Sequence, residues 1–297
     1  MKRFKLLGLF LILAVTLLPA LVAAQITGPI VSVADLEKNL TNPSVVVLDV
    51  RKVEEYKEGH IPGAINAAYG SWAIKKGELL NELPAIEDLS DVIAGAGIDW
   101  DSQVVIVGKT DKVPDQFDMT RVAWTLKYLG VPNVAILSGG QNQWVKEGKP
   151  LSQDMVRAKV KKFRASVTDN LFVNKAYVTD NLGKAAIIDT RAPAFYEGKE
   201  KLAFVPKLGR IKGAVNLPAG QLFTPEGLYK DKAALAALAE KAVGTDLAKE
   251  IILYCDTGKT CTGWALILKD MLGYQNVKIY DGSSMEWMAD PAAPSEP

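Results

Sequence analysis

The chain has 297 residues, which is enough for about two domains of ordinary size. Its 48% hydrophobic and 23% charged residues are ordinary globular values and exclude a disordered chain, a coiled coil and a polytopic membrane protein. The formal net charge is +1 and no basic run occurs, so nucleic acid is not expected as a partner. With one histidine and two cysteines in the sequence, a closed zinc site is excluded and neither a metal nor a cofactor is expected.

Residues 1–24 have the layout of a secretory signal peptide. A cationic start is followed by an apolar run that Pro19 ends, and Ala24 is a small residue suited to cleavage. An uncleaved anchor is the alternative, because the apolar segment is nearly long enough to span a bilayer. We therefore expect a periplasmic or secreted protein that meets a membrane only through its leader.

The remainder of the chain contains one unit twice. Four segments of the first half recur in the same order in the second: 45–56 matches 186–196, 59–66 matches 209–216, 104–108 matches 251–255, and 128–144 matches 271–287. Agreement at four separate places indicates a tandem duplication. The predicted organisation is a first domain at 28–150, a polar linker at 151–170, a second domain at 171–290 and a disordered tail at 291–297.

Within each copy, short β-branched runs alternate with helical stretches. The runs VVVLD, VVIVG and VAILSG are nearly continuous apolar segments of the kind found in buried parallel strands, and AIIDT, IILYC and VKIYDG repeat them. A helix is expected between the last two strands of each copy, near 118–129 and 260–272. The pattern predicts an α/β fold with two parallel sheets, each covered by helices on both faces, and reactive groups at the carboxyl ends of strands.

Cys255 ends one of these predicted strands and starts the loop CDTGKT, which leads into a predicted helix. Backbone N–H groups and the dipole at a helix start favour a thiolate. Gly258 would let the loop curl around the sulfur, and Lys259 would add positive charge. An inert buried cysteine explains the strand but not this loop, and a P-loop is excluded because Leu253 stands where that motif needs glycine. The sequence therefore predicts a nucleophilic Cys255.

Several motifs together resemble the two-domain rhodaneses, a family of sulfurtransferases. They are the duplication, Y-x3-HIPGA at 56–64, the two D-x-R pairs, C-x-x-G-x-T from Cys255, and YDGSxxEW at 280–287. The resemblance covers about residues 30–290. It implies that Cys255 takes a sulfane sulfur from a small-molecule donor such as thiosulfate, forms a persulfide, and passes the sulfur to a thiol, cyanide or sulfite-like acceptor. It also implies a catalytically silent first domain, since Gly108 occupies the position of Cys255.

The resemblance also implies a set of substrate-binding residues in the loop and in the second D-x-R pair. These are Arg191, Asp256, Thr257, Gly258, Lys259 and Thr260. Arg191 would bind an anionic donor or support the loop, and it could equally form a structural ion pair with Asp189. His60, in the silent copy, is expected to have a structural role, and Arg210 is either a cation near the site or a surface residue.

The loop departs from both family patterns. Thiosulfate-type relatives usually have two cations after the cysteine, where this chain has Asp256 and Thr257. Mercaptopyruvate-type relatives usually have C-G-[ST]-G-V-T, which this chain matches at Thr257, Gly258 and Thr260. Asp256 is expected to repel a dianionic donor, with Lys259 partly offsetting it, so 3-mercaptopyruvate sulfurtransferase activity stays open as an alternative.

Cys261 leaves a further alternative open. The phosphatase or arsenate-reductase version of such a fold is disfavoured because Cys261 stands where that chemistry needs arginine. The pair of Cys255 and Cys261 is compatible with a sulfur or selenium carrier, or with a dithiol redox module that serves a redox or sulfur-acceptor protein. In the dithiol redox module Cys261 would be a resolving thiol. In the alternative interpretation it is a small residue packed at the start of the helix.

Overall fold

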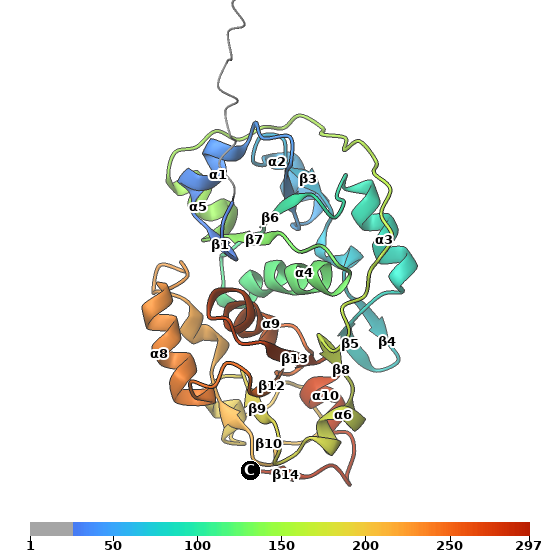
Figure 1. Ribbon diagram of the computed structural model, residues 1–297, viewed down its shortest axis with the longest axis vertical. Helices are drawn as coiled ribbons and strands as arrows, with labels where there is room; N and C mark the ends of the chain where they lie inside the picture. Colours follow the sequence, from blue (N-terminus) through green and yellow to red (C-terminus); the bar gives the residue numbers. More distant parts are fainter. Residues whose placement is uncertain (1–25) are drawn as a thin grey trace, which may run out of the picture.

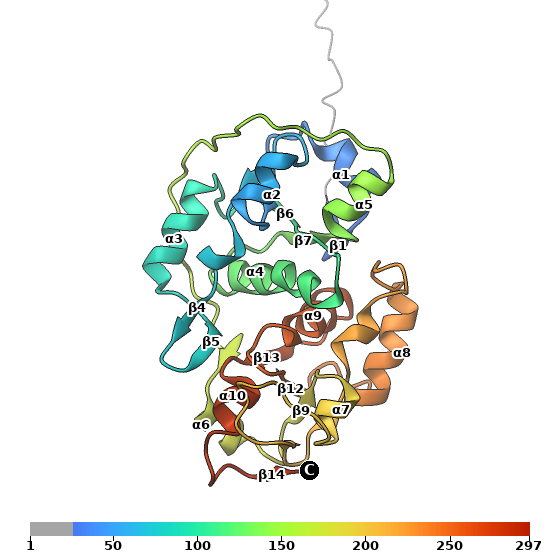
Figure 2. The same cartoon turned by 180° about the vertical axis from the view of Figure 1, so that it is seen from behind.

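The computed structural model describes residues 26–297, so the predicted leader lies outside the described residues. Figures 1 and 2 show two layered α/β domains stacked on one another, with α4 of the first and α9 of the second between the two sheets. No helix in residues 26–297 is long and apolar enough to cross a membrane.

The first domain is built on a five-stranded parallel sheet in the order β1-β7-β6-β2-β3. Helices α1, α2 and α5 pack on one face, and α3 and α4 pack on the other. A β4–β5 hairpin projects toward the second domain. The elements are β1 (Ile30–Val31), α1 (Val33–Asn39), β2 (Val45–Asp49), α2 (Val53–Glu58), β3 (Ile65–Asn66), β4 (Ile74–Lys76), β5 (Leu79–Glu82), α3 (Ile86–Gly95), β6 (Gln103–Val107), α4 (Gln116–Tyr128), β7 (Val134–Leu137) and α5 (Gly140–Lys146), with 3₁₀ turns at Tyr69–Ser71 and Val113–Asp115.

The second domain repeats this plan with the parallel order β11-β9-β12-β13-β8. Helices α8 and α9 pack on one face of the sheet, and α6 and α10 pack on the other. The elements are β8 (Phe172–Val173), α6 (Lys175–Asp180), β9 (Ala186–Asp189), α7 (Pro193–Tyr196), β10 (Arg210–Ile211), β11 (Val215–Asn216), a 3₁₀ turn (Ala219–Leu222), α8 (Lys232–Val243), β12 (Glu250–Tyr254), α9 (Cys261–Leu266), a π-helical turn (Ile267–Met271), β13 (Asn276–Tyr280), α10 (Ser283–Trp287) and β14 (Ser295–Glu296).

The predicted α/β architecture is therefore confirmed. Both sheets are parallel because each strand is followed by a helix that crosses back over the sheet, which leaves the strands buried on both faces. The helices expected near 118–129 and 260–272 are α4 and the combination of α9 with its π-helical turn.

The two domains share a hydrophobic core at their interface. Phe117 and Trp124 of α4 are buried among side chains of the second domain, and Leu266 of α9 is buried among those of the first. The hydroxyl groups of Thr120 and Thr262 lie 2.7 Å apart within this contact. Burial of apolar side chains on both helices holds the domains in a fixed relation.

The linker between the domains has no regular secondary structure, whereas the C-terminal tail pairs with a strand. Residues 153–168 of the predicted linker contain no helix or strand and run around the outside of the first domain (Figure 1). The tail, predicted to be disordered, is instead ordered: β14 pairs with β10 in an antiparallel ladder. The Trp287 indole N–H donates to the Pro294 carbonyl at 3.1 Å, and the Arg210 guanidinium lies 3.1 Å from the Glu296 carboxylate. The prediction of a disordered tail was wrong because β10 offers free backbone groups with which this polar segment can pair.

Candidate active site

The loop of residues 255–260, here called the cysteine loop, begins where β12 ends at Tyr254. It leads directly into α9, which starts at Cys261. Gly258 has a φ of +69°, and a Cβ atom there would lie 2.5 Å from the carbonyl oxygen of Asp281. Only glycine fits this conformation and this close approach, so the predicted curling of the loop at Gly258 has a geometric basis.

The Cys255 thiol is 1% exposed and sits inside the curl of this loop. Burial by itself would raise its pKa. Hydrogen bonds from the side chains of Cys261 and Thr260, and from the backbone N–H groups of Cys261 and Thr257, outweigh burial and lower the pKa of Cys255 to about 5. Cys255 is therefore a thiolate at neutral pH, and the same donors can hold the anion of a persulfide in its place.

Cys261 is one of these donors. It is free and fully buried, as is Cys255. Burial and the hydrogen bond to Cys255 raise the pKa of Cys261 well above its usual range. Cys261 thus keeps its proton and donates a hydrogen bond to the neighbouring thiolate.

The backbone of the cysteine loop is held from α10 by Ser283. The Ser283 hydroxyl accepts hydrogen bonds from the N–H groups of Cys255 at 3.2 Å and Gly258 at 2.9 Å, and donates to the Tyr280 carbonyl at 2.8 Å. Ser283 has a φ of +49°, an uncommon value for a residue with a side chain. The YDGSxxEW motif therefore places a hydroxyl group beneath the loop.

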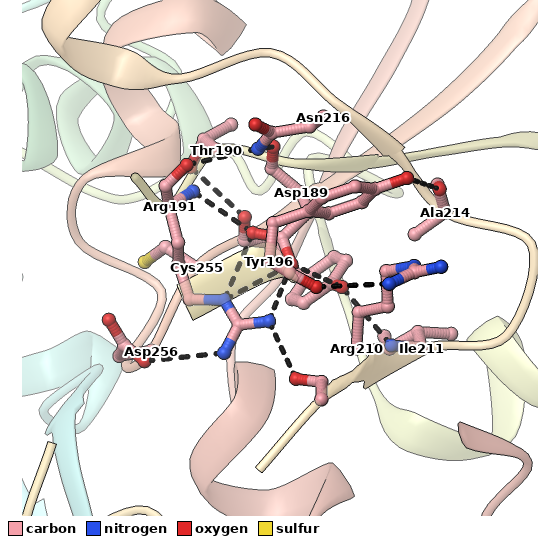
Figure 3. A network of polar contacts seen from close by, with 12 residues as sticks. Asp189, Thr190, Arg191, Tyr196, Arg210, Ile211, Ala214, Asn216, Cys255 and Asp256 are labelled. Atoms are coloured by element: carbon pink, nitrogen blue, oxygen red, sulfur yellow. Dashed lines mark hydrogen bonds and ion pairs between the residues drawn. The ribbon is translucent and has the colours of Figure 1, made fainter. Parts of the chain in front are cut away.

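Arg191 is anchored below the loop by Asp189 (Figure 3). Its guanidinium binds both carboxylate oxygens of Asp189 at 2.6–3.1 Å and donates to the Gly209 carbonyl at 2.9 Å. The Tyr254 hydroxyl donates to the same carboxylate at 2.7 Å. The remaining guanidinium nitrogen points toward Asp256, 3.8 Å away. Arg191 thus forms the structural ion pair and also reaches the loop.

Asp256 follows Cys255 directly, and its side chain is 19% exposed. Burial and the charge of the Cys255 thiolate raise the pKa of its carboxyl group to about 7, against the opposing effect of Arg191. Its Oδ1, the oxygen that faces Arg191 at 3.8 Å, is buried and has no closer hydrogen-bond partner among the described residues. The protonation state of Asp256 therefore changes near neutral pH.

The other face of the cysteine loop is held by side chains of the first domain. Asn81, on β5, donates from its amide to the Thr257 hydroxyl at 2.8 Å. Arg121, on α4, is fully buried and donates to the Gly258 carbonyl at 2.9 Å. It also pairs with Asp281 at 2.5 Å. The first domain is silent as a nucleophile, but it supplies part of the wall of the site.

Lys259 also turns toward the first domain. Its ammonium group pairs with Asp118 and lies 4.9 Å above the Tyr69 ring. The positive charge of Lys259 is therefore engaged away from the mouth of the site. Arg210 is engaged as well, by Glu296 and by the Tyr196 ring 4.4 Å from its guanidinium carbon.

The corresponding place in the first domain lacks the reactive group. Arg51 binds Asp49 as Arg191 binds Asp189, but Gly108 follows β6 where Cys255 follows β12. His60 is fully buried, stacks on the Tyr56 ring at 3.8 Å, and its Nδ1 lies 2.9 Å from the Tyr56 carbonyl oxygen. These contacts are structural, as expected for a residue in the silent copy.

A cavity of about 570 Å³ opens beside the cysteine loop, between the two domains. Asp256, Thr260 and Arg191 are among the residues that line it. The Thr260 hydroxyl also donates to the Cys255 sulfur, so the cavity lies beside the thiol, although Cys255 itself is not among the residues that line it. Most of its wall is apolar and includes Val113, Phe117, Pro193, Phe195, Leu202 and Pro218.

The structure divides the predicted binding residues into two groups. Arg191, Asp256 and Thr260 line the cavity. The side chains of Thr257 and Lys259 contact the first domain, and Gly258 shapes the loop. Sequence reasoning missed Asn81 and Arg121, and a buried arginine in the apolar stretch of α4 was the one available hint. It also missed Ser283, although that residue lies in a motif that had been singled out.

Comparison with known proteins agrees with this geometry. The chain matches the Rhodanese-like domain twice, over residues 32–147 and 174–290. It is 31% identical to the sulfur carrier protein TtuD of Thermus thermophilus, over 87% of this chain and 93% of that protein. It is 32% identical to the thiosulfate sulfurtransferase of Bos taurus, over 79% of each chain. The crystal structure of SseA from Escherichia coli, described with the 3-mercaptopyruvate sulfotransferases, superimposes with a TM-score of 0.73 at 27% identity, covering 86% of this chain and 99% of that one.

Proposed function

This chain belongs to the tandem rhodanese family of sulfurtransferases, and on that premise we propose that it transfers sulfane sulfur by double displacement through Cys255. In the first half-reaction the Cys255 thiolate attacks the outer sulfur of a donor such as thiosulfate. The bond to the sulfonate sulfur breaks, sulfite leaves with the electron pair, and the enzyme keeps a persulfide. A thiophilic acceptor then removes the outer sulfur and restores the thiolate.

The observation that carries this proposal is the set of donors around Cys255. Two side chains and two backbone N–H groups converge on one buried sulfur and lower its pKa to about 5. A buried anion without such partners would be strongly destabilising, so the loop is built for a negative charge at this position. The anionic persulfide of the proposed cycle carries that same charge.

The donor is proposed to be thiosulfate, with 3-mercaptopyruvate as the alternative. Asp256 lines the cavity and disfavours a dianion, whereas mercaptopyruvate brings a single carboxylate. The partial match of Thr257, Gly258 and Thr260 to the mercaptopyruvate-type loop supports the alternative. A cyanide assay with each donor in turn separates them: thiocyanate forms from both, and the larger kcat/KM identifies the preferred donor.

Secretion is part of the proposal. The cationic and apolar layout of residues 1–24 supports export and cleavage after Ala24. N-terminal sequencing of the protein recovered from a periplasmic or culture fraction tests it. A chain beginning at Gln25 is expected, and a chain that keeps residues 1–24 in the cytosolic fraction would contradict export.

A carrier function is the second candidate. It is supported by Cys261, which contacts the nucleophile, and by the relative named as a sulfur carrier protein. A carrier of sulfur or selenium would form the persulfide but release thiocyanate slowly. A dithiol redox module would form a disulfide between Cys255 and Cys261. Turnover well above one thiocyanate per protein, with both thiols free afterwards, favours the enzyme.

A further inference from the structure

The linker between the two domains carries a group of basic residues that the proposed function does not use. Five of the eight residues 157–164 are lysine or arginine, and none is acidic. They are interspersed with apolar residues in the order RAKVKKFR, so the sequence shows no uninterrupted basic run. Their arrangement in space becomes visible only when the linker is seen packed on the first domain.

This part of the linker lies extended against the first domain and passes beside α3 in both views (Figures 1 and 2). The Lys161 N–H donates to the Ala94 carbonyl at 3.0 Å, and the Phe163 ring lies 5.8 Å from the Trp100 ring. Side chains of an extended chain point alternately to opposite sides. Ala158, Lys161 and Phe163 are half-buried, whereas the exposed cations are Arg157, Lys159, Lys162 and Arg164, here called the basic face.

The charge of the basic face is available to a partner. Lys161, on the inner side of the segment, pairs with Asp99 at 2.8 Å. The four cations of the basic face have no ion pair among the described residues, and no carboxylate lies within residues 157–164. The linker therefore presents a row of free positive charges on a chain whose formal net charge is only +1.

Apolar side chains stand in water among these cations. Val160 is 72% exposed, and Trp100, which contacts the linker through Phe163, is 47% exposed. The chain has six tryptophans, and the other five are at most 1% exposed. An exposed indole among lysines and arginines suits the headgroup level of a bilayer, where its ring is covered and the cations meet phosphate. Duplex phosphates would bind the cations but leave the apolar side chains in water.

The position of the basic face agrees with a membrane. The Ile26 N–H donates to the Gln103 side chain at 3.0 Å, and the Lys161 ammonium group donates to the neighbouring Ser102 hydroxyl at 3.2 Å. The described chain therefore begins on the edge of the first domain that carries the basic face. The cavity beside the cysteine loop is at the other end of β6, because Val113 follows that strand and Gln103 starts it. Contact with a bilayer at the basic face leaves this cavity open to water.

We propose that the basic face is a membrane-docking surface, which binds the headgroups of anionic phospholipids and places Val160 and Trp100 at the headgroup level. The attraction is electrostatic and reversible, and it is separate from the chemistry of Cys255. It would hold the exported protein at a bilayer surface with its active site facing the solvent.

Co-sedimentation with vesicles tests the proposal. Vesicles of phosphatidylcholine alone are compared with vesicles in which a third of the lipid is phosphatidylglycerol. The natural protein and all variants share the same N-terminus, so residues 1–24 contribute equally to each measurement. We expect binding to the anionic vesicles at about 0.1 M salt and its loss at about 1 M, because the screening length falls from about 10 Å to about 3 Å.

Two variants and a matched control locate the surface. Each basic residue strengthens binding to an anionic surface about fivefold, so the double variant Lys159→Gln/Lys162→Gln should bind about twentyfold more weakly. Val160→Trp should bind several-fold more tightly, since an added indole favours the interface. Lys232→Gln/Lys241→Gln makes the same change of net charge at exposed positions of α8 and should bind as the natural protein does.

Trp100 gives an independent readout. As the one exposed tryptophan of the described chain, it should account for most of the quenching of fluorescence by acrylamide, and anionic vesicles should protect it. Thiocyanate formation from thiosulfate and cyanide should be the same with and without vesicles. A protein that docks but transfers no sulfur would contradict the proposed function and leave the docking surface intact.

Three results would overturn the docking proposal. The first is equal binding to neutral and anionic vesicles, or none to either. The second is a Lys159→Gln/Lys162→Gln variant that binds anionic vesicles as tightly as the control variant. The third is tighter binding to duplex DNA or to polyglutamate than to the anionic vesicles, which would assign the basic face to a nucleic acid or to an acidic protein.

Discussion

At the scale of single residues, the reactivity of Cys255 depends on donors that surround a buried sulfur. Burial alone would keep the thiol protonated, and the opposing hydrogen bonds lower its pKa to about 5. Because the pKa is lowered, the thiolate is present above about pH 5 and is lost as the pH falls through that value. Sulfur loading should follow the same titration, with an acid limb near pH 5.

Cys261 should affect the pH at which sulfur loading is lost on the acid side, without being required for sulfur transfer. Cys261→Ala removes one donor, so the pKa of Cys255 rises and the acid limb of kcat/KM for the donor moves to higher pH. Cys261→Ser keeps a hydroxyl donor and should stay close to the natural protein, with most activity retained by both variants at pH 8. Measuring the pH dependence of persulfide formation for the three proteins tests this. Complete loss of transfer in Cys261→Ala at every pH, with a disulfide in the natural protein, would identify a dithiol enzyme instead.

At the scale of elements, the cysteine loop is held between α10 of its own domain and the β4–β5 hairpin and α4 of the first domain. Asn81 is the contact with the most specific geometry. Its φ of +60° is favoured only by glycine and a few polar residues, its amide oxygen accepts from the Tyr69 hydroxyl at 3.0 Å, and its nitrogen donates to Thr257. Because the Thr257 N–H donates to the Cys255 sulfur, Asn81 is a positioning residue for the thiolate.

Asn81→Gly tests this role without adding backbone strain. Glycine accepts the positive φ, so the free energy of unfolding should change by less than about 1 kcal/mol. The lost amide should nevertheless raise the pKa of Cys255 and lower kcat/KM for the donor several-fold near pH 6. Asn170→Gly is the matched control, because Asn170 has a φ of +66° and is exposed in the linker. An Asn81→Gly variant whose pH profile is unchanged would show that Thr257 needs no support from the first domain.

The elements also show what the sequence could predict. The strands, the two helices before the last strand of each copy, and the place of Cys255 follow from apolar runs and from the internal repeat, which are local signals. The pairing of β14 with β10 does not follow, because a polar segment with three prolines gives no strand signal and its partner is an edge of two residues. The same limit applies to Asn81, which lies 176 residues from the threonine it contacts.

At the scale of the whole molecule, the silent domain is a structural part of the active site. Arg121 connects the hairpin of its own domain, through the Asn81 carbonyl at 2.5 Å, to the cysteine loop and to Asp281 of the second domain. These contacts of Arg121 lie against the hydrophobic core that α4 and α9 share. The first domain, which has Gly108 at the position of Cys255, therefore contributes to the site through these contacts.

Arg121→Met should accordingly lower the free energy of unfolding of both domains together, in one transition. The substitution leaves Asp281 without its buried partner, and breaking such a pair costs about 3–5 kcal/mol. Urea unfolding followed by tryptophan fluorescence should show one transition in both proteins, at a lower midpoint in the variant. Lys149→Met removes an ion pair with Glu37 at the surface and should cost less than about 1 kcal/mol. Two separate transitions in the natural protein would contradict the coupling of the domains.

The central claim is that Cys255 carries the transferred sulfur, and intact mass spectrometry after incubation with thiosulfate or 3-mercaptopyruvate tests it most directly. The account predicts a gain of one sulfur atom per chain, located on the peptide that contains Cys255, and its loss on addition of cyanide. Cys255→Ser should fold normally, because the swap is nearly isosteric, and should gain nothing. A well-folded Cys255→Ser variant that still gains the sulfur, or a natural protein that carries it on Cys261, would contradict the account.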